Sequence, residues 1–586
     1  MNNFRHTVLA SVIHLTLLGM TDVSAADSVA MEKRIHELES RLEKMDQLEK
    51  RLAKMDLLEK RLEKLDRLEA MSVKSEPVPI APQVINVSPE VAKLKTKVNI
   101  LERKLEVQEE VNTAAFKKLP IFDGGENGFK ITSSDKKHQL RIGSAIQTDY
   151  RNFLGDNPSA WIPGSSTSTT PGPAGWLGGV GPDSIFLRQA RIILEGYVFN
   201  DIYFKLMPDF AQTSNTSNLI PDAFVDFAYE KKASLLVGKY KPSIGLERLQ
   251  GDVNTVFLER AFPTNLAPNR DMGLQLHGAF AKPGYSAEKV VGAIDSKNAF
   301  TYQVGITNGT GDSGNIAMNG ALPNTSSQFA NNKEFDGRIF AQPFQHSGYD
   351  WLEGFGIGVS GSFSNPDHLA LSAQRTPLGQ SQFVDYTSLN GQAAGSAGNY
   401  ASSSRIITSN GNANRIYPQA FWYSGPFGLM GEYVRSTQTL NASGSSVIGG
   451  SKVNNITQTN TASQVQLSYV VTGEDNQFEG VKPIRNFDPA KGTWGALQLA
   501  GRWSELDVDN DTFTLLDPTK TASKATAFTV GANWFLNKYS LIRFDYENVF
   551  FTGGAGSTSG SGVNAVSHIA NRPSEQVLST RFQLAF

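Results

Sequence analysis

The chain of 586 residues contains no cysteine, which excludes disulfide scaffolds, thiolate metal sites and cysteine nucleophiles. It also has no apolar run long enough for a membrane-spanning helix, and its mean hydropathy is −0.28, which excludes a polytopic helical membrane protein. The 55 basic and 57 acidic residues nearly cancel, so bulk charge does not indicate a nucleic-acid partner. The length fits two to four domains or one large β-barrel.

Residues that could build an enzyme site are also scarce. The chain has eight histidines and no HExxH motif, and no GxSxG or phosphate-binding loop lies between a strand and a helix. Asp545 and Glu547 are close in sequence, but two carboxylates on one face of a strand more simply line water than perform acid–base catalysis. We therefore predict no enzymatic activity, no cofactor and no metal.

The first 26 residues have the features of a secretory signal peptide. Arg5 precedes a short apolar run at residues 8–18, and Ser24, Ala25 and Ala26 supply small residues for cleavage. The apolar run is too short to span a bilayer. Export combined with the lack of cysteine predicts a periplasmic or outer-membrane protein.

A charged helical arm is predicted to follow, beginning with a coiled-coil segment over residues 27–76. Leucine and methionine recur there in a ten-residue repeat: LESRLEKMDQ, LEKRLAKMDL and LEKRLEKLDR. The spacing is about 3.3 residues per turn and predicts an overwound coiled coil. A Pro-rich linker (77–89) separates it from a second coiled-coil helix over residues 90–119. Self-association would bury the apolar seam, while the alternative is a single helix held by Glu–Lys pairs.

From residue 120 to residue 586 the hydrophobic period changes from 3.6 to two. Near the C-terminus, Ile542, Phe544 and Tyr546 share one face of a strand, whereas Arg543, Asp545 and Glu547 share the other. A transmembrane β-barrel requires this alternation, because one face meets lipid and the other a polar lumen. We therefore predict an all-β fold, a transmembrane antiparallel β-barrel of about 16 strands, preceded by the α-helical coiled coil.

The predicted strands and connections fit such a barrel. The strands are expected near residues 138–152, 184–199, 201–211, 220–230, 233–242, 271–281, 299–308, 334–344, 353–363, 413–423, 427–439, 463–472, 493–506, 525–535, 539–550 and 575–586. Short connections are predicted to be periplasmic turns, and long polar ones to be outer loops, at residues 153–183, 364–412, 440–462 and 551–574. Phe586, which follows an alternating strand, fits an outer-membrane assembly signal.

Strand parity places charged side chains in the predicted lumen. The cations are Arg141, Arg151, Arg191, Lys205, Lys239, Lys241, Arg338, Arg415, Arg502, Arg543 and Arg581. The acids are Asp149, Glu195, Asp209, Asp226, Glu432, Asp545 and Glu547. The cations lead, but the barrel as a whole is close to neutral, so anion selectivity would depend on the arrangement of these charges. For each residue alone, a solvated wall charge or an ion pair is the competing interpretation.

The segment 242–270 is the predicted constriction. It contains several apolar residues, among them Leu246, Phe257 and Phe262, together with the cations Arg248, Arg260 and Arg270. Folding into the lumen would bury the apolar side chains and narrow the pore. The alternative is an ordinary external loop.

These segments resemble the phosphate-selective porin O and P family across residues 120–586. The resemblance rests on FLRQARIILEGYVFNDIYFKLMPDF (186–210), DAFVDFAYEKKASLLVGKYKPSIGLE (222–247) and FLERAFPTNLAPNRDMGLQLHG (257–278). It implies a trimer of sixteen-stranded barrels that passes phosphate or polyphosphate along arginines and lysines. It also implies a basic pair at Arg188 and Arg191. Where the family often has two adjacent basic residues, this chain has Arg188 followed by Gln189.

The resulting hypothesis is an outer-membrane porin, inserted in outer-membrane lipid as a homotrimer, for small anions such as phosphate or polyphosphate. The expected pathway residues are Arg141, Arg188, Arg191, Lys205, Lys239, Lys241, Arg248, Arg260, Arg270, Arg338 and Arg543. The alternative is a general or differently selective porin whose coiled-coil arm tethers the envelope by binding peptidoglycan.

Overall fold

The structure is a computed structural model that describes residues 89–116, 118–124, 128–154, 183–211, 220–286, 298–312, 333–367, 369–384, 386, 407–442, 447–448, 451–452, 455–516, 518–559 and 566–586. The predicted signal peptide, the ten-residue repeat and the Pro-rich linker up to residue 88 lie outside these residues. The chain divides into two units, Met1–Val107 and Gln108–Phe586.

The first described element is the helix α3 (Pro89–Phe116), where the sequence predicts a helix. Its Val98, Leu101 and Leu105 side chains are exposed, by 45%, 59% and 67%. Their spacing of three and four residues places them along one stripe of the helix. Pairing of this stripe with another helix stays a prediction. Among the described residues, no helix is both long and apolar enough to cross a bilayer.

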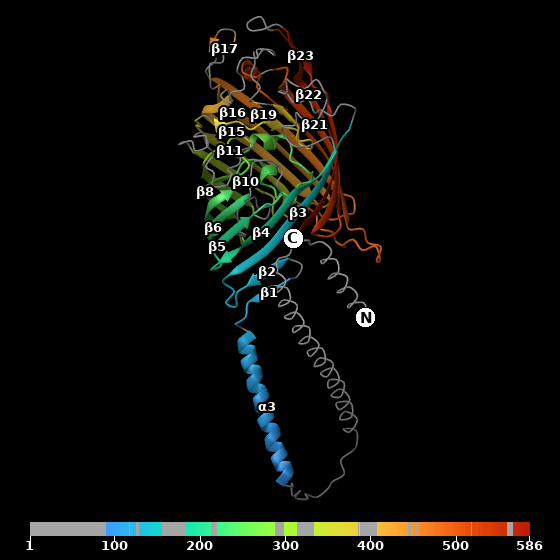
Figure 1. Ribbon diagram of the computed structural model, residues 1–586. Helices are drawn as coiled ribbons and strands as arrows, with labels where there is room; N and C mark the ends of the chain where they lie inside the picture. The colour runs from blue at the N-terminus through green and yellow to red at the C-terminus, as the bar shows by residue number, and fades with distance from the viewer. Residues whose placement is uncertain are drawn as a thin grey trace, which may run out of the picture. The chain divides into compact units, whose positions relative to one another are not determined.

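Sixteen antiparallel strands form a closed barrel, and every predicted strand range overlaps one of them. They are β3 (Gln139–Leu154), β4 (Asp183–Val198), β5 (Ile202–Met207), β6 (Asp222–Glu230), β7 (Ala233–Tyr240), β8 (Asp271–Phe280), β9 (Phe300–Thr307), β10 (Glu334–Ala341), β11 (Gly354–Ser364), β15 (Ile407–Ser424), β16 (Phe427–Ala442), β19 (Ile456–Val470), β20 (Ala496–Asp507), β21 (Ala522–Phe535), β22 (Ser540–Ser559) and β24 (Glu575–Ala585). Pairing of β24 with β3 closes the ring, so neither strand leaves an open edge (Figure 1).

Shorter elements decorate the barrel. A hairpin of β1 (Ile121–Asp123) and β2 (Phe129–Thr132) pairs with the start of β3. The others are α4 (Leu246–Leu249), η2 (Phe262–Leu266), α5 (Asp350–Glu353), β12 (Leu369–Ala370), β13 (Gln374–Arg375), β14 (Gln382–Val384), β17 (Val447–Ile448), β18 (Ser451–Lys452), η4 (Asn510–Thr514) and β23 (Val566–Asn571).

Side chains alternate across the wall as the period of two predicts. Phe544 and Phe582 lie on the outer face and are 46% and 55% exposed, whereas Arg543 and Arg581 lie on the inner face and are buried. In a soluble protein this arrangement would leave a large apolar surface in water. In a bilayer the apolar face meets lipid and the backbone is fully paired within the wall, which is the arrangement that a transmembrane barrel requires.

The two ends of the barrel differ in their connections. Residues 231–232, 425–426 and 536–539 are short links at one end, which we call the turn end. The connection 471–495 also lies at the turn end and is far longer than the links 425–426 and 536–539, as the predicted strands 463–472 and 493–506 led us to expect. At the opposite end, β16 reaches Ala442 and β19 begins at Ile456, so the predicted loop 440–462 is shorter than expected.

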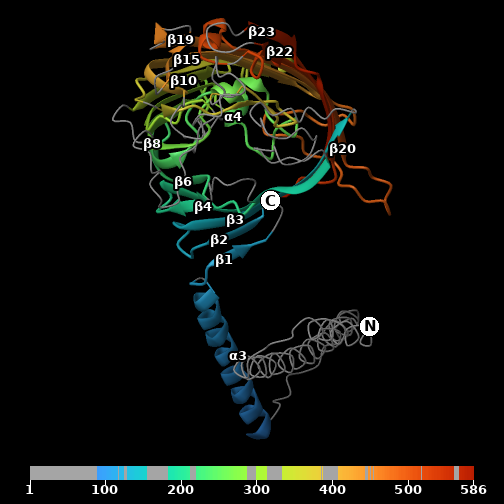
Figure 2. The same ribbon diagram turned by 45° about the horizontal axis from the view of Figure 1, so that its top comes forward.

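Part of the chain lies inside the ring of strands. Figure 2 shows α4 surrounded by the barrel wall. Leu246 within it has no exposed surface, and neither do Phe257 and Phe262 farther along the same connection between β7 and β8. The segment 242–270 is therefore packed within the lumen, as its apolar residues led us to expect.

Candidate functional site

The segment 242–270, which we call the constriction loop, is fixed to one side of the lumen by apolar packing. Ile244, Phe262 and Leu266 are fully buried in one cluster with wall residues, among them Tyr417. The Tyr417 hydroxyl also donates a hydrogen bond to the Pro263 carbonyl oxygen at 2.6 Å. Burial of large apolar side chains against the wall gives the loop a single location in the lumen.

Charged side chains of the wall hold the backbone of this loop. The Leu258 amide donates to Asp545 Oδ2 at 2.6 Å, and Arg543 Nη1 donates to the Phe257 carbonyl oxygen at 2.9 Å. Gly531 permits this close packing, because a Cβ there would lie 2.6 Å from Asp545 Oδ1 and 3.2 Å from the Phe257 ring. These lumen charges therefore satisfy loop backbone groups that would otherwise be buried without partners.

A second segment, residues 371–386, also enters the lumen. Phe383 packs edge-to-face on Phe262 with ring centroids 5.6 Å apart. The Leu378 amide donates to Glu547 Oε1 at 2.7 Å, and Asn265 Nδ2 donates to the Arg375 carbonyl oxygen at 2.7 Å. The prediction that residues 364–412 form only an outer loop is wrong here, because this part buries its apolar side chains beside the constriction loop.

A third segment enters from the turn end. In the connection 471–495, Phe478 is buried and stacks on Phe421 with ring centroids 5.3 Å apart. Gln250 Nε2 in the constriction loop donates to the Phe478 carbonyl oxygen at 2.7 Å. Asn476 fits against Gly428, where a Cβ would lie 2.7 Å from its Nδ2 atom. The turn-end segment is thus anchored to both the wall and the constriction loop.

The space left open lies along the wall formed by β3 to β7 and, at the turn end, also along β20, β21, β22 and β24. An inner cavity of about 290 Å³ and a turn-end cavity of about 440 Å³ have six lining residues in common, including Lys205 and Asn254. Strand residues line one side of both cavities, and residues 251–256 of the constriction loop and residues 477–482 line the other. We call these adjoining cavities the passage.

Basic side chains outnumber acidic ones in the passage. Its described lining contains eight cations: Arg141, Arg191, Lys205, Lys241, Arg270, Lys482, Lys538 and Arg543. It contains four carboxylates: Glu195, Asp222, Asp252 and Glu479. The chain as a whole has a net charge of −2, so the basic excess is local. A local excess of one sign inside low-dielectric walls concentrates counter-ions.

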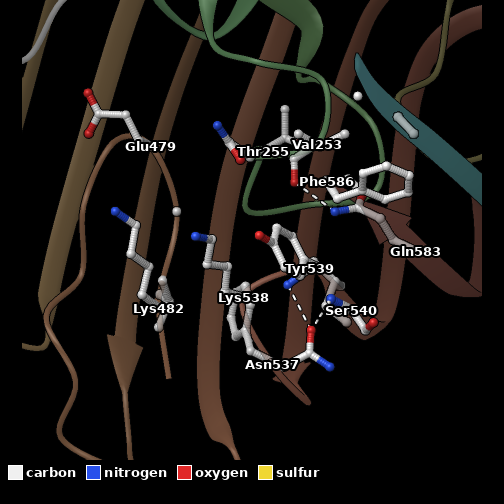
Figure 3. Close-up of a pocket in the computed structure, with 18 of the residues that line it drawn as sticks. Val253, Thr255, Glu479, Lys482, Asn537, Lys538, Tyr539, Ser540, Gln583 and Phe586 are labelled. Atoms are coloured by element: carbon white, nitrogen blue, oxygen red, sulfur yellow. Dashed lines mark hydrogen bonds between the residues drawn. The ribbon is translucent and has the colours of Figure 1, made fainter. Parts of the chain in front are cut away.

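Two lysines at the turn end were missed by the sequence analysis. Figure 3 shows Lys482 and Lys538 extending from neighbouring segments into the turn-end cavity, with Glu479 nearby. Both lie in connections rather than strands, so strand parity could not place them. The apolar residues Phe478 and Val481 beside Lys482 are the signal that could have shown this connection to be buried.

Two predicted pathway residues line the passage with much of their charge available. Arg141 Nη1 donates to Glu195 Oε1 at 3.1 Å, and the Arg141 side chain is 48% exposed. Lys205 Nζ lies 3.9 Å from Asp222 Oδ2 and is 25% exposed. Weak pairing and exposure leave both cations able to attract a passing anion.

Four other predicted pathway residues line the passage in tighter contacts. Arg191 pairs with both Asp209 and Asp252, Lys241 Nζ lies 2.8 Å from Asp252 Oδ1, and Arg270 Nε lies 2.7 Å from Asp222 Oδ1. Arg543, by contrast, donates to carbonyl oxygens of the constriction loop.

The remaining predicted pathway residues do not line the passage. Arg188 Nε lies 2.6 Å from Glu259 Oε1, and Arg248 Nη2 donates to the Thr264 carbonyl oxygen at 2.6 Å. Arg260 contacts Asp252 from within the loop, at 2.5 Å. Lys239 and Arg338 are buried in the wall, and Arg338 lies over the Phe340 ring at 4.5 Å.

A β-bulge explains why Arg188 and Arg191 both point inward although they are three residues apart. Gln147 pairs with Gln189, whereas Thr148 pairs with Leu187, so Arg188 is an extra residue in β4. The bulge places Arg188 and Gln189 on the same face. Gln189 therefore faces the lumen as a neutral amide. In the family that this chain resembles, a second basic residue often stands at this position.

Comparison with protein families matches residues 182–586 to the family described as phosphate-selective porin O and P. Comparison with curated protein sequences finds no match. Similar solved structures include an anion-selective porin from Comamonas acidovorans, with 9% identity and a TM-score of 0.40 over 77% of this chain and 100% of that one. Outer-membrane expressed OmpT of Vibrio cholerae has 9% identity and a TM-score of 0.41, over 77% and 98% of the two chains.

The matched residues run from the beginning of β4 to the end of the barrel and include all three segments that enter the lumen. Membership in a porin family indicates a channel rather than an enzyme. The closed barrel, the apolar outer face and the charged passage agree with that assignment. The chain is an outer-membrane porin and belongs to the phosphate-selective porin O and P family.

Proposed function

We propose that the passage conducts small anions, with phosphate or short polyphosphate as the preferred class. The observation that carries this proposal is the local excess of cations, eight against four carboxylates among the described lining residues. An anion meets basic side chains in both cavities, and their excess over the carboxylates attracts it. A cation of similar size would be repelled by the same field.

Conduction would proceed through several weak sites in succession. Lys482 and Lys538 face an anion at the turn end, Lys205 lies at the junction of the two cavities, and Arg191 and Arg270 lie in the inner cavity. Each can replace part of the hydration shell of an oxyanion with charge-assisted hydrogen bonds. Existing carboxylate partners weaken each site, which lets the anion leave.

Phosphate is favoured over other anions by the family to which the chain belongs and by the abundance of guanidinium groups. Guanidinium nitrogens match the geometry of phosphate oxygens, whereas chloride offers no such geometry. Gln189 removes one cation from this part of the lumen, so we expect weaker phosphate binding than two adjacent arginines would give.

Reversal potentials in planar bilayers test the proposal. With a potassium chloride gradient across the purified porin, we expect a potential that indicates chloride over potassium. Added phosphate should then reduce the chloride current in a concentration-dependent manner. A preference for potassium would overturn the anion proposal, and anion preference without phosphate block would support the general-porin alternative.

We also propose that the porin is a homotrimer and that the arm, residues 27–119, strengthens assembly and reaches peptidoglycan. The exposed stripe of Val98, Leu101 and Leu105 on α3 supports self-association, because pairing would remove it from water. Deleting residues 27–119 should weaken attachment of the outer membrane to the cell wall without changing single-channel conductance. If the deletion left attachment of the outer membrane to the cell wall unchanged, the proposal that the arm binds peptidoglycan would be contradicted.

A further inference from the structure

The carboxylate of Asp252 in the constriction loop is surrounded by four cations. Its Oδ1 atom lies 2.5 Å from Arg260 Nη2 and 2.8 Å from Lys241 Nζ. Its Oδ2 atom contacts Arg191 Nη1 and lies 3.3 Å from Arg270 Nη2. Only 9% of the Asp252 side chain is exposed. No other carboxylate in the described part of the chain has this many basic partners.

These four cations come from three separate parts of the barrel. Arg191 belongs to β4, Lys241 directly follows β7, and both Arg260 and Arg270 lie in the constriction loop. The fold therefore gathers them around one point, and three of the four line the inner cavity. Such a convergent set of donors is the arrangement that binds an oxyanion.

Other carboxylates compensate only part of this charge. Arg191 also pairs with Asp209, and Arg270 also pairs with Asp222. Without Asp252, the four cations would be balanced by these two acids, and Asp222 also lies 3.9 Å from Lys205. Removing Asp252 would thus leave these four basic side chains with two directly paired carboxylates, Asp209 and Asp222.

The ionisation of Asp252 is strongly favoured by this setting. Burial opposes the charged form, but Lys241, Arg260, Arg191 and Arg270 together outweigh it and hold the pKa of Asp252 well below its usual range. Asp252 consequently remains an anion across the pH range in which porins operate.

We propose that Asp252 is a tethered counter-anion that occupies the oxyanion site of the passage, so that a permeating phosphate must compete with it for Arg191, Lys241 and Arg270. This inference rests on the proposed anion function and names the residue that sets its strength. Asp252 lowers the affinity of the inner cavity for tetrahedral oxyanions. The lower affinity shortens the residence of the ion and favours throughput over tight binding.

The test compares Asp252→Asn with Glu195→Gln in full-length porin. Both variants remove one carboxylate from the passage and change its charge equally, but Glu195 pairs with Arg141 alone among the basic residues that the structure describes. We expect the phosphate concentration that halves the chloride current to fall about tenfold in Asp252→Asn, a difference of about 1.4 kcal/mol. In Glu195→Gln we expect a change of less than about twofold. Equal changes in the two variants would overturn the inference.

Two further variants distinguish competition between Asp252 and phosphate from a folding defect and from a simple change in net charge. The double variant Asp252→Asn with Arg260→Gln restores the net charge of the group formed by Asp252 and its four cations. It still frees Arg191, Lys241 and Arg270, so tighter phosphate block should persist. In Asp252→Glu the phosphate concentration that halves the chloride current should stay within about twofold of the wild-type value, because the carboxylate is retained. If only Asp252→Glu forms a folded barrel, judged by heat-modifiable migration, Asp252 is a structural residue and the inference fails.

Failure of the inference can be distinguished from failure of the proposed function. The reversal potential of the wild-type porin decides whether the passage prefers anions. The contrast between Asp252→Asn and Glu195→Gln decides whether Asp252 competes with the permeating ion. An anion-selective wild type with no contrast between these variants would retain the function and reject the competitor.

Discussion

The two sides of the lumen use the same residue types for different purposes. Along β3 to β7, Arg141 and Lys205 line open space and are only loosely paired. Along β20 to β24, Arg502 and Arg581 are buried beneath the constriction loop. Arg581 lies 2.7 Å from Asp149, and Arg502 lies over the Phe257 ring at 4.4 Å. The strands β3 to β7 border the inner cavity, whereas β20 to β24 hold the constriction loop.

The difference shows that the number of lumen charges is a poor guide to how many of them face open space. A buried arginine whose donors are taken by carboxylates and loop carbonyl oxygens has little left to offer a permeating ion. A partly exposed lysine beside open space retains most of its field. Four predictions test this contrast.

The largest loss of stability is expected when a buried charge is removed from the side formed by β20 to β24. Arg581→Met leaves the buried Asp149 carboxylate without the guanidinium that donates to both its oxygens at 2.7 Å. We expect a loss of about 3–5 kcal/mol in the free energy of unfolding. Arg141→Gln, which breaks an exposed pair, should cost about 1 kcal/mol or less. Urea titration of the refolded barrel measures both, and equal losses would contradict the contrast.

The turn-end segment should depend strongly on its one buried aromatic residue. Phe478→Ala removes the ring that stacks on Phe421 and should destabilise the porin by about 3 kcal/mol. Residues 471–495 would then be free to leave the passage, so we also expect higher single-channel conductance. Phe487→Ala, in the same connection but beside Trp494 and Trp534, is the matched comparison. Conductance unchanged by Phe478→Ala would mean that this segment does not narrow the passage.

The charges that hold the constriction loop should survive mild acid. Burial opposes ionisation of Glu259, but the nearby Arg188 guanidinium outweighs it and lowers the pKa of Glu259 from 4.5 to about 2. Because the folded-state pKa is lowered, the stability that this group contributes is present above about pH 4.5 and is lost as pH falls towards 2. Unfolding midpoints between pH 7 and pH 3 should therefore fall less in Glu259→Gln than in wild type.

A smaller effect is expected for one cation of the open side. Lys205→Gln should reduce the permeability ratio of chloride to potassium about threefold, because Lys205 lines both cavities and is poorly compensated. Lys231→Gln, at an exposed turn where Lys231 Nζ contacts Ser286, should leave the ratio unchanged. A similar change in both variants would show that overall charge, rather than position in the passage, controls selectivity.

Much of the wall could be predicted from the sequence because a barrel strand must alternate. The period of two located all sixteen strands, and the apolar residues of the constriction loop indicated its place in the lumen. The segments 371–386 and 471–495 escaped notice because Gly, Pro and polar residues surround their few apolar side chains. The buried apolar residues that anchor these segments are Leu378 and Phe383 in the first and Phe478 in the second.

The availability of each cation could not be predicted. Parity indicates which face a side chain occupies, but the partner that neutralises it comes from distant parts of the chain. Asp149 and Arg581 are 432 residues apart, and Arg191 meets an acid of the constriction loop. Such pairs depend on barrel closure and on loop placement, neither of which is encoded in local spacing.

The bulge in β4 has a consequence for how relatives of this porin are aligned. In a strand that alternates regularly, Arg188 would lie on the face opposite Gln189, which is the lipid face, where an arginine at mid-membrane costs about 2–4 kcal/mol. A single insertion thus turns an unfavourable side chain into one that holds Glu259 in the lumen. In this fold, new lumen chemistry can arise from a change in length without any change in residue type. Homologous arginines should therefore be matched by the face they occupy, counted from the bulge, rather than by column.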